Sequence, residues 1–182
     1  GKGAKNGILI KNAEALEQLQ KVNVLITDKT GTLTEGKPSL DEISVVENGD
    51  KNQILKLAAA LNQNSEHPLS SAVLNEFKKE NTEFHKVENF ENISGKGIKG
   101  IINGTTVLLG NEALLNQFNI TVPEILKNEV IRKQDEAKTV SYLAFGDQVL
   151  GSLNFSDKIK TSSKLAIEYL QKNNVEVIMM TG

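Results

Sequence analysis

Apolar residues recur along the chain in several patterns, and these patterns predict most of its secondary structure. Residues 22–27 and 175–180 are nearly continuous apolar runs, which are typical of strands buried in a parallel sheet. Residues 40–47 alternate between apolar and polar side chains, as a half-buried strand does. Other segments place apolar residues three or four positions apart, and this spacing predicts helices. The helices are expected at residues 12–22, 51–64, 65–80, 112–118, 123–138 and 156–174.

Short polar signals predict where these elements begin, end or turn. Asn103-Gly104 lies between two apolar runs and predicts a tight hairpin, and Gly146-Asp147 predicts a second one. Ser65 and Asn111 are expected to cap helices. Asp157 is expected near the start of the last helix, where the helix dipole favours an acidic residue. Residues 35–38, Glu-Gly-Lys-Pro, are expected to form a turn or hinge.

The order of the predicted elements indicates an α/β protein built from two interleaved parts. Hairpins imply an antiparallel sheet, whereas uninterrupted apolar runs imply a parallel one. We therefore expect an α+β domain with an antiparallel sheet, residues 38–152, inserted into a split parallel α/β domain formed by residues 1–37 and 153–182. The last apolar run stops without a following helix, which favours an excised and truncated piece of a longer chain.

The composition excludes several kinds of partner. With 21 basic and 23 acidic residues the net charge is −2, so no nucleic acid partner is expected. The chain has no cysteine, which excludes disulfides and thiolate metal sites within it. No apolar segment approaches the roughly 20 residues needed to cross a bilayer. Met179 and Met180 are expected in the core. These features favour a soluble, intracellular type of chain.

The first apolar run delivers one carboxylate, that of Asp28, into a loop of threonine and glycine. In open parallel sheets, ligands bind beyond the carboxyl ends of the strands. Lys29, Thr30, Gly31 and Thr32 supply a positive charge, hydroxyls and backbone amides, the groups that cradle a phosphoryl group. A carboxylate can attack phosphorus when Mg²⁺ and amides neutralise the charge and hold the reactants in line. The pattern therefore predicts an aspartyl phosphate on Asp28.

Residues 28–34, Asp-Lys-Thr-Gly-Thr-Leu-Thr, resemble the signature of P-type ATPases, ion pumps that phosphorylate this aspartate from ATP. The resemblance implies that residues 1–37 and 153–182 form a Rossmann-like phosphorylation domain of the haloacid dehalogenase type. It implies catalytic roles for Asp28, Lys29 and Thr30, and an incomplete Mg²⁺ site at Asp28 and Thr30. Related phosphatases carry a second aspartate at the position of Thr30. Threonine cannot protonate a poor leaving group near neutral pH, whereas ADP needs no such acid.

Residues 65–69, Ser-Glu-His-Pro-Leu, resemble a motif of heavy-metal P-type ATPases whose histidine, here His67, helps to place the adenine of ATP. The resemblance extends to a glycine pair, Gly95 and Gly97, and to Gly110-Asn111, and it implies that residues 38–152 form the nucleotide-binding domain. A histidine at a helix start can stack on a base, and glycines allow close backbone approach. Taken singly, each feature is also compatible with a cap or a flexible turn.

The nucleotide motif departs from the family pattern at one position. Asn62 lies where family members commonly carry a glutamate that contacts the adenine amino group. Its amide oxygen can still accept a hydrogen bond, but without a charge. Glu66, next to His67, is a further candidate contact with the nucleotide.

The end of the chain also resembles the family. Asp157 and Lys160 match the Asp-Pro-Ile-Lys segment at which the chain re-enters the phosphorylation domain, although Lys158 replaces its proline. Thr181 and Gly182 match the first two residues of the family's Thr-Gly-Asp phosphate loop. We therefore expect these four matching residues at the phosphate site or at the hinge between the domains.

Together the motifs imply the ATP-binding and phosphorylation part of a heavy-metal pump, with ATP and Mg²⁺ as ligands, and the Ser-Glu-His-Pro motif favours Cu⁺ export. The implied partners are the actuator and transmembrane domains of the same parent chain, and a copper chaperone for the full-length pump. The piece would then be a cytoplasmic domain of an integral membrane protein. Two alternatives stay open: a phosphatase of the haloacid dehalogenase superfamily and a non-catalytic nucleotide-binding module.

Overall fold

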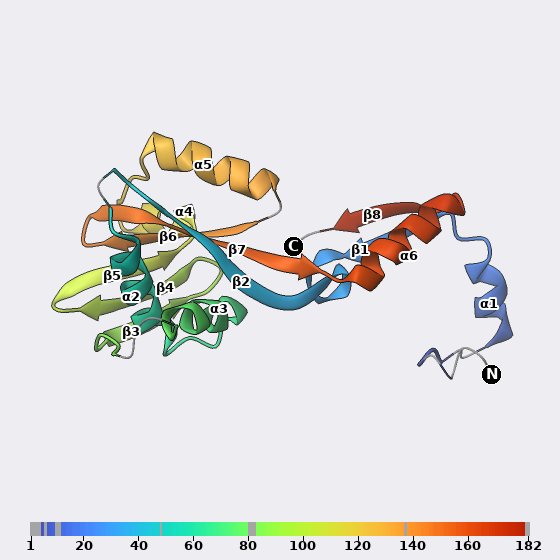
Figure 1. The fold of residues 1–182 in the computed structure, drawn as a ribbon, viewed down its shortest axis with the longest axis horizontal. Coiled ribbons are helices and arrows are strands. Elements are labelled where there is room, and N and C mark those ends of the chain that lie inside the picture. Colours follow the sequence, from blue (N-terminus) through green and yellow to red (C-terminus); the bar gives the residue numbers. More distant parts are fainter. Residues whose placement is uncertain are drawn as a thin grey trace. The chain divides into compact units, whose positions relative to one another are not determined.

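The computed structural model describes residues 5, 7–9, 12–47, 49–79, 83–136 and 138–180 (Figure 1). The chain divides into two compact units. Residues 1–36 and 159–182 form the first, here called the split unit, and residues 37–158 form the second, here called the inserted unit. The sequence places the two crossovers between the domains at 37/38 and 152/153. No helix in the described part of the chain has both the length and the apolar content needed to cross a membrane.

Along the chain, the elements of the split unit come before and after those of the inserted unit, as expected for an inserted α+β unit. In the split unit they are α1 (Ala13–Leu19), β1 (Val24–Asp28), the irregular turn η2 (Lys29–Leu33), α6 (Thr161–Lys172) and β8 (Glu176–Met180). Two strands run between the units, β2 (Thr34–Val45) and β7 (Gln148–Ile159). The remaining elements are α2 (Lys51–Asn62), α3 (Pro68–Phe77), β3 (Glu88–Ile93), β4 (Gly97–Ile102), β5 (Thr105–Gly110), α4 (Glu112–Gln117), α5 (Glu124–Asp135) and β6 (Thr139–Phe145).

The split unit contains the predicted parallel pair. β1 pairs in parallel with β8, and Asp28 lies opposite Met180 at the carboxyl ends of both strands. The prediction that these strands are buried is wrong for most of their side chains, since Ile26 and Met180 are each 59% exposed. The sheet of the split unit has only two strands in the described part of the chain, so each strand has one hydrogen-bonded neighbour. An apolar run is buried only where other elements cover it.

The inserted unit is built on a six-stranded sheet in the order β2-β7-β6-β5-β4-β3. The pairs from β3 to β7 are antiparallel, as the predicted hairpins require. β4 and β5 are joined at Asn103-Gly104, where both residues have positive φ, +50° and +76°. Such angles are those of the tight turns that match strand twist, and they explain the strength of the Asn-Gly signal. β6 and β7 turn at Gly146-Asp147, as predicted.

Alternation along the strands gives the sheet two apolar faces with separate cores. α2 and α3 cover one face, where the buried side chains include Leu109, Leu143 and Phe155. α4 and α5 cover the other face, where they include Leu108 and Ala144. Successive strand residues point to opposite faces, so β5, β6 and β7 each contribute buried side chains to both cores.

Three local predictions are wrong, and for the first two the reason lies outside the local sequence. Residues 35–38 form no turn but lie within β2, although the boundary between the two units falls inside them, at 36/37. β2 is at the edge of its sheet, where Pro38 can be accommodated because an edge strand has one side without partners. Asp157 lies in β7 and accepts a hydrogen bond from the N–H of Lys37 at 3.2 Å, so it is not at a helix start. The cap of α3 is His67 and not Ser65.

Candidate functional site

Asp28 is the last residue of β1, and its side chain is exposed at the end of the parallel pair. The turn η2 follows at once, with Thr30 extended (φ −77°, ψ 122°) and Gly31 at φ +76°. Only glycine adopts that φ without steric cost, so Gly31 lets the chain turn sharply behind the carboxylate. The strand thus ends with a carboxylate that solvent can reach.

Two side chains of the split unit hold the loop after Asp28. Thr34 is 2% exposed, and its hydroxyl accepts the N–H of Gly31 at 3.0 Å and donates to the carbonyl of Lys29 at 3.3 Å. Lys160 donates from Nζ to the carbonyls of Gly31 (2.7 Å) and Thr32 (3.1 Å). The N–H of Lys160 also reaches the carbonyl of Leu33 at 3.0 Å. Lys160 therefore fixes the loop through its backbone, which leaves the Asp28 carboxylate outside this network.

A divalent cation could use only part of this site. The described residues contain no group of three or more His, Cys, Asp or Glu side chains that could hold a metal ion. The carboxylate of Asp28 and the hydroxyl of Thr30 are oxygen ligands of the kind that Mg²⁺ prefers. Mg²⁺ usually takes one or two carboxylates together with waters and phosphate oxygens. These two residues fit the part of such a site that a phosphorylated substrate would complete.

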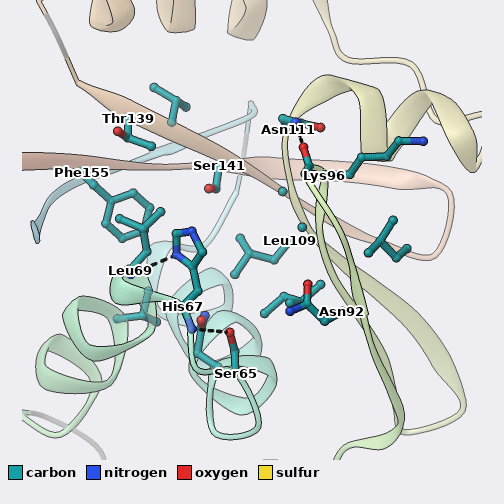
Figure 2. A pocket seen from close by; sticks show the side chains of 18 residues that line it. Ser65, His67, Leu69, Asn92, Lys96, Leu109, Asn111, Thr139, Ser141 and Phe155 are labelled. Carbon is teal, nitrogen blue, oxygen red and sulfur yellow. Dashed lines mark hydrogen bonds between the residues drawn. The ribbon is translucent and has the colours of Figure 1, made fainter. Parts of the chain in front are cut away.

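The inserted unit holds a pocket of about 320 Å³ between the α2–α3 connection and the β3–β4 turn (Figure 2). Six residues that the sequence predicts for nucleotide binding line it: Asn62, His67, Gly95, Gly97, Gly110 and Asn111. They come from the end of α2, the start of α3, the turn into β4 and the end of β5, and the packing of α2 and α3 on the sheet brings them together. Glu66 is exposed and does not line this pocket.

His67 has a structural task as well as a place in the pocket. Its Nδ1 accepts the backbone N–H of Leu69 at 3.2 Å and so caps α3. A neutral imidazole that accepts at Nδ1 carries its proton on Nε2. Figure 2 shows the ring among the lining side chains. The cap therefore orients the ring and leaves an N–H donor for a ligand.

Asn62 is oriented by the helix that ends with it. It is 4% exposed, and its Nδ2 donates to the carbonyl of Ala58 at 2.8 Å, one turn earlier in α2. This bond uses one of the two N–H groups of the amide and does not involve its oxygen. Asn62 lines the pocket, and that its oxygen accepts a hydrogen bond from an amino group there stays a prediction.

The glycines and Asn111 form a tightly packed corner of the pocket. Gly97 and Gly110 face each other across β4 and β5, and a Cβ on either would overlap the backbone of the other strand. Asn111 donates from Nδ2 to the carbonyl of Gly95 at 2.9 Å, and its Oδ1 accepts the N–H of Leu114 at 3.1 Å. Gly97 and Gly110 thus let two strands meet. Around Gly95, by contrast, the space for a Cβ is open.

Residues 22–182 match the family of haloacid dehalogenase-like hydrolases. The chain belongs to that family. It is 41% identical over 182 residues to a copper-transporting P-type ATPase of Rhizobium leguminosarum bv. viciae, and 40% identical over 183 residues to a copper-exporting P-type ATPase of Legionella pneumophila subsp. pneumophila. Both alignments cover 100% of this chain but only 22% and 24% of those proteins.

A solved structure agrees with this assignment. The crystal structure of a zinc-transporting PIB-type ATPase in the E2.Pi state superposes with a TM-score of 0.70 at 30% identity, covering 97% of this chain and 28% of that one. The α/β fold class and the resemblance to heavy-metal P-type ATPases are therefore confirmed. The names of these proteins include different metals, so they do not select the ion.

In this haloacid dehalogenase-like chain, the other predicted residues have distinct positions. Lys160 is at the loop after Asp28, whereas Asp157 lies in the inserted unit against Lys37. Thr181 and Gly182 lie outside the described residues. Sequence reasoning missed Ser141 and Phe155, which line the pocket from β6 and β7. Side chains alternate between the two faces of a strand, so the positions of the second hairpin that face α2 and α3 could have been predicted from this alternation.

Proposed function

We propose that this chain is the ATP-binding and phosphate-accepting part of a heavy-metal P-type ATPase, with Cu⁺ as the exported ion. The observation that carries the proposal is the exposed carboxylate of Asp28 at the end of β1, followed by a loop that Lys160 and Thr34 hold through its backbone. It is supported by the family and by two curated relatives that their names describe as copper pumps.

In the proposed reaction, ATP binds in the pocket of the inserted unit and donates its γ-phosphoryl group to Asp28. A carboxylate oxygen of Asp28 forms a bond to the γ-phosphorus, the bond from that phosphorus to the bridging oxygen breaks, and ADP leaves with the electron pair. ADP is a good leaving group, so a threonine at position 30 is sufficient. Mg²⁺, when bound, would neutralise phosphate charge beside Asp28.

The binding step uses groups that are already oriented. We infer that Asn62 accepts a hydrogen bond from the adenine amino group and that the His67 ring contacts the base. The open backbone at Gly95 leaves room for the ligand. We propose the same partners that the motifs imply. They are the actuator and transmembrane domains of the parent, and a copper chaperone that delivers its ion.

The test is phosphorylation of the full-length parent protein with ATP labelled at the γ-phosphate. We expect an acid-stable, hydroxylamine-sensitive label in the wild type and none in Asp28→Asn. Asp147→Asn, a matched change at the exposed β6–β7 turn, should retain the label. A label that survives Asp28→Asn would contradict the assignment. Efficient hydrolysis of generic phosphate esters, with no phosphorylated intermediate on Asp28, would favour the phosphatase alternative instead.

A further inference from the structure

The described side chains that line the pocket of the inserted unit include a positively charged lysine but no carboxylate. None of the described residues that line it is acidic, and Lys96 is the only lysine or arginine among them. The other polar groups of the lining are amides, hydroxyls and the imidazole of His67. A nucleoside triphosphate carries several negative charges, so a cation at the pocket would act mainly on the phosphates and little on the base.

The backbone of Lys96 is fixed on both sides. Its N–H donates to the carbonyl of Ile93 at 3.0 Å, and its own carbonyl accepts the N–H of Asn111 at 2.9 Å. The side chain of Lys96, by contrast, is held by a hydrogen bond to another side chain. Its Nζ donates to Oε1 of Gln117, on α4, at 2.7 Å, and this contact is exposed. Figure 2 shows the side chain directed away from the middle of the pocket.

We propose that Lys96 binds the polyphosphate of the nucleotide and that it leaves Gln117 to do so. This inference rests on the proposed function. The amide oxygen of Gln117 is neutral, whereas hydrogen bonds between ammonium and phosphate are charge-assisted and about twice as strong. The flexible four-carbon stem of lysine allows the ammonium to move while the backbone stays in place. Gln117 keeps the charge beside the pocket until phosphate replaces it.

A neighbouring lysine does not compete for this role. Lys99 lies on β4, where its Nζ is 2.6 Å from Oε2 of Glu91 and 5.3 Å from the centre of the Phe118 ring. It does not line the pocket. Because its charge is already paired with a carboxylate and an aromatic ring, Lys99 is a matched control for Lys96.

The experiment is a calorimetric titration of the chain with ATP and, separately, with adenosine, both without Mg²⁺. For Lys96→Gln we expect the ATP affinity to fall roughly three- to tenfold, which corresponds to one charge-assisted contact at an exposed position, and the adenosine affinity to stay unchanged. Lys99→Gln should change neither. An equal loss for both ligands, or no loss of ATP affinity, would overturn the role of Lys96.

A second variant tests the exchange between partners. Gln117→Glu places a carboxylate where the amide oxygen accepts from Lys96, so the ion pair should hold the ammonium and weaken ATP binding, with adenosine again unaffected. Unchanged ATP affinity in Gln117→Glu would contradict the exchange. If the wild type bound neither adenosine nor ATP, the proposed function itself would fail, and the inference on Lys96 with it.

Discussion

The paired glycines of the pocket illustrate how one residue can have two explanations. Gly97 has φ +147°, and a Cβ there would overlap the carbonyl oxygen of Leu109 and the Cα of Gly110. Gly95, two residues earlier, has φ +70° but open space around it. Family resemblance assigns both glycines to the nucleotide site, whereas the packing shows that Gly97 is also needed for β4 and β5 to pair.

This difference predicts unequal costs of substitution. Gly97→Ala should lower the free energy of unfolding by about 2 to 4 kcal/mol, because it adds steric overlap with a packed strand to an unfavourable φ. Gly95→Ala should cost only about 1 to 2 kcal/mol, the usual price of a left-handed non-glycine residue. Urea denaturation followed by circular dichroism measures both values. Equal losses would show that overlap with β5 does not matter.

The start of α3 shows how a helix can prepare a ligand-binding group. Pro68 occupies the first position of the helix, where its missing N–H is no loss. The next free donor, the N–H of Leu69, is accepted by the ring of His67. The hydrogen bond that caps α3 therefore also holds the His67 ring in its position in the pocket.

Two substitutions at His67 can separate capping from binding. His67→Asn keeps a favoured capping residue, so the stability of the chain should stay within about 0.5 kcal/mol of the wild type, whereas His67→Ala should cost about 1 kcal/mol. Because both remove the imidazole, both should weaken ATP binding. Chemical denaturation and titration with ATP give the two quantities. Normal ATP affinity in His67→Asn would remove the ring from the site and leave it only the cap.

Sequence reasoning succeeded where the signal is local and failed where distant elements decide. Asn103-Gly104 specifies its turn by its own φ preferences, and Asn111 caps α4 as predicted. Residues 35–38 carry equally strong local signals, yet strand pairing at the sheet edge extends β2 through them. Asp157 likewise lies in β7, although its sequence is compatible with a helix start. The pocket itself could be listed from motifs only in part, because its walls come from strands that pair across the fold.

Burial differs sharply between the two units. All the apolar side chains that are buried in the described part of the chain belong to the inserted unit. In the split unit, the buried residues among those described are Thr34 and Ser163, both polar. Since apolar burial is the main stabilising contribution to folding, the two units should differ in their resistance to local opening.

Hydrogen exchange detected by mass spectrometry should reveal this difference in the present chain. We expect amides of β5 and β6 to exchange on the order of a hundredfold or more slowly than those of β1 and β8, after correction for intrinsic rates. Opening of the split unit exposes little additional apolar surface, so it costs less free energy. Protection of β1 and β8 as strong as that of β5 would contradict the prediction.

Lys160 binds the carbonyls of Gly31 and Thr32 across a sequence separation of 128 to 129 residues. A residue that follows the insertion thereby holds a loop that precedes it, so the two ends of the inserted segment are joined by hydrogen bonds. The inserted segment could consequently change in length or content during evolution while these hydrogen bonds are kept. Such divergence must preserve Lys160 and the loop carbonyls that it binds, because the conformation of the loop beside Asp28 depends on both.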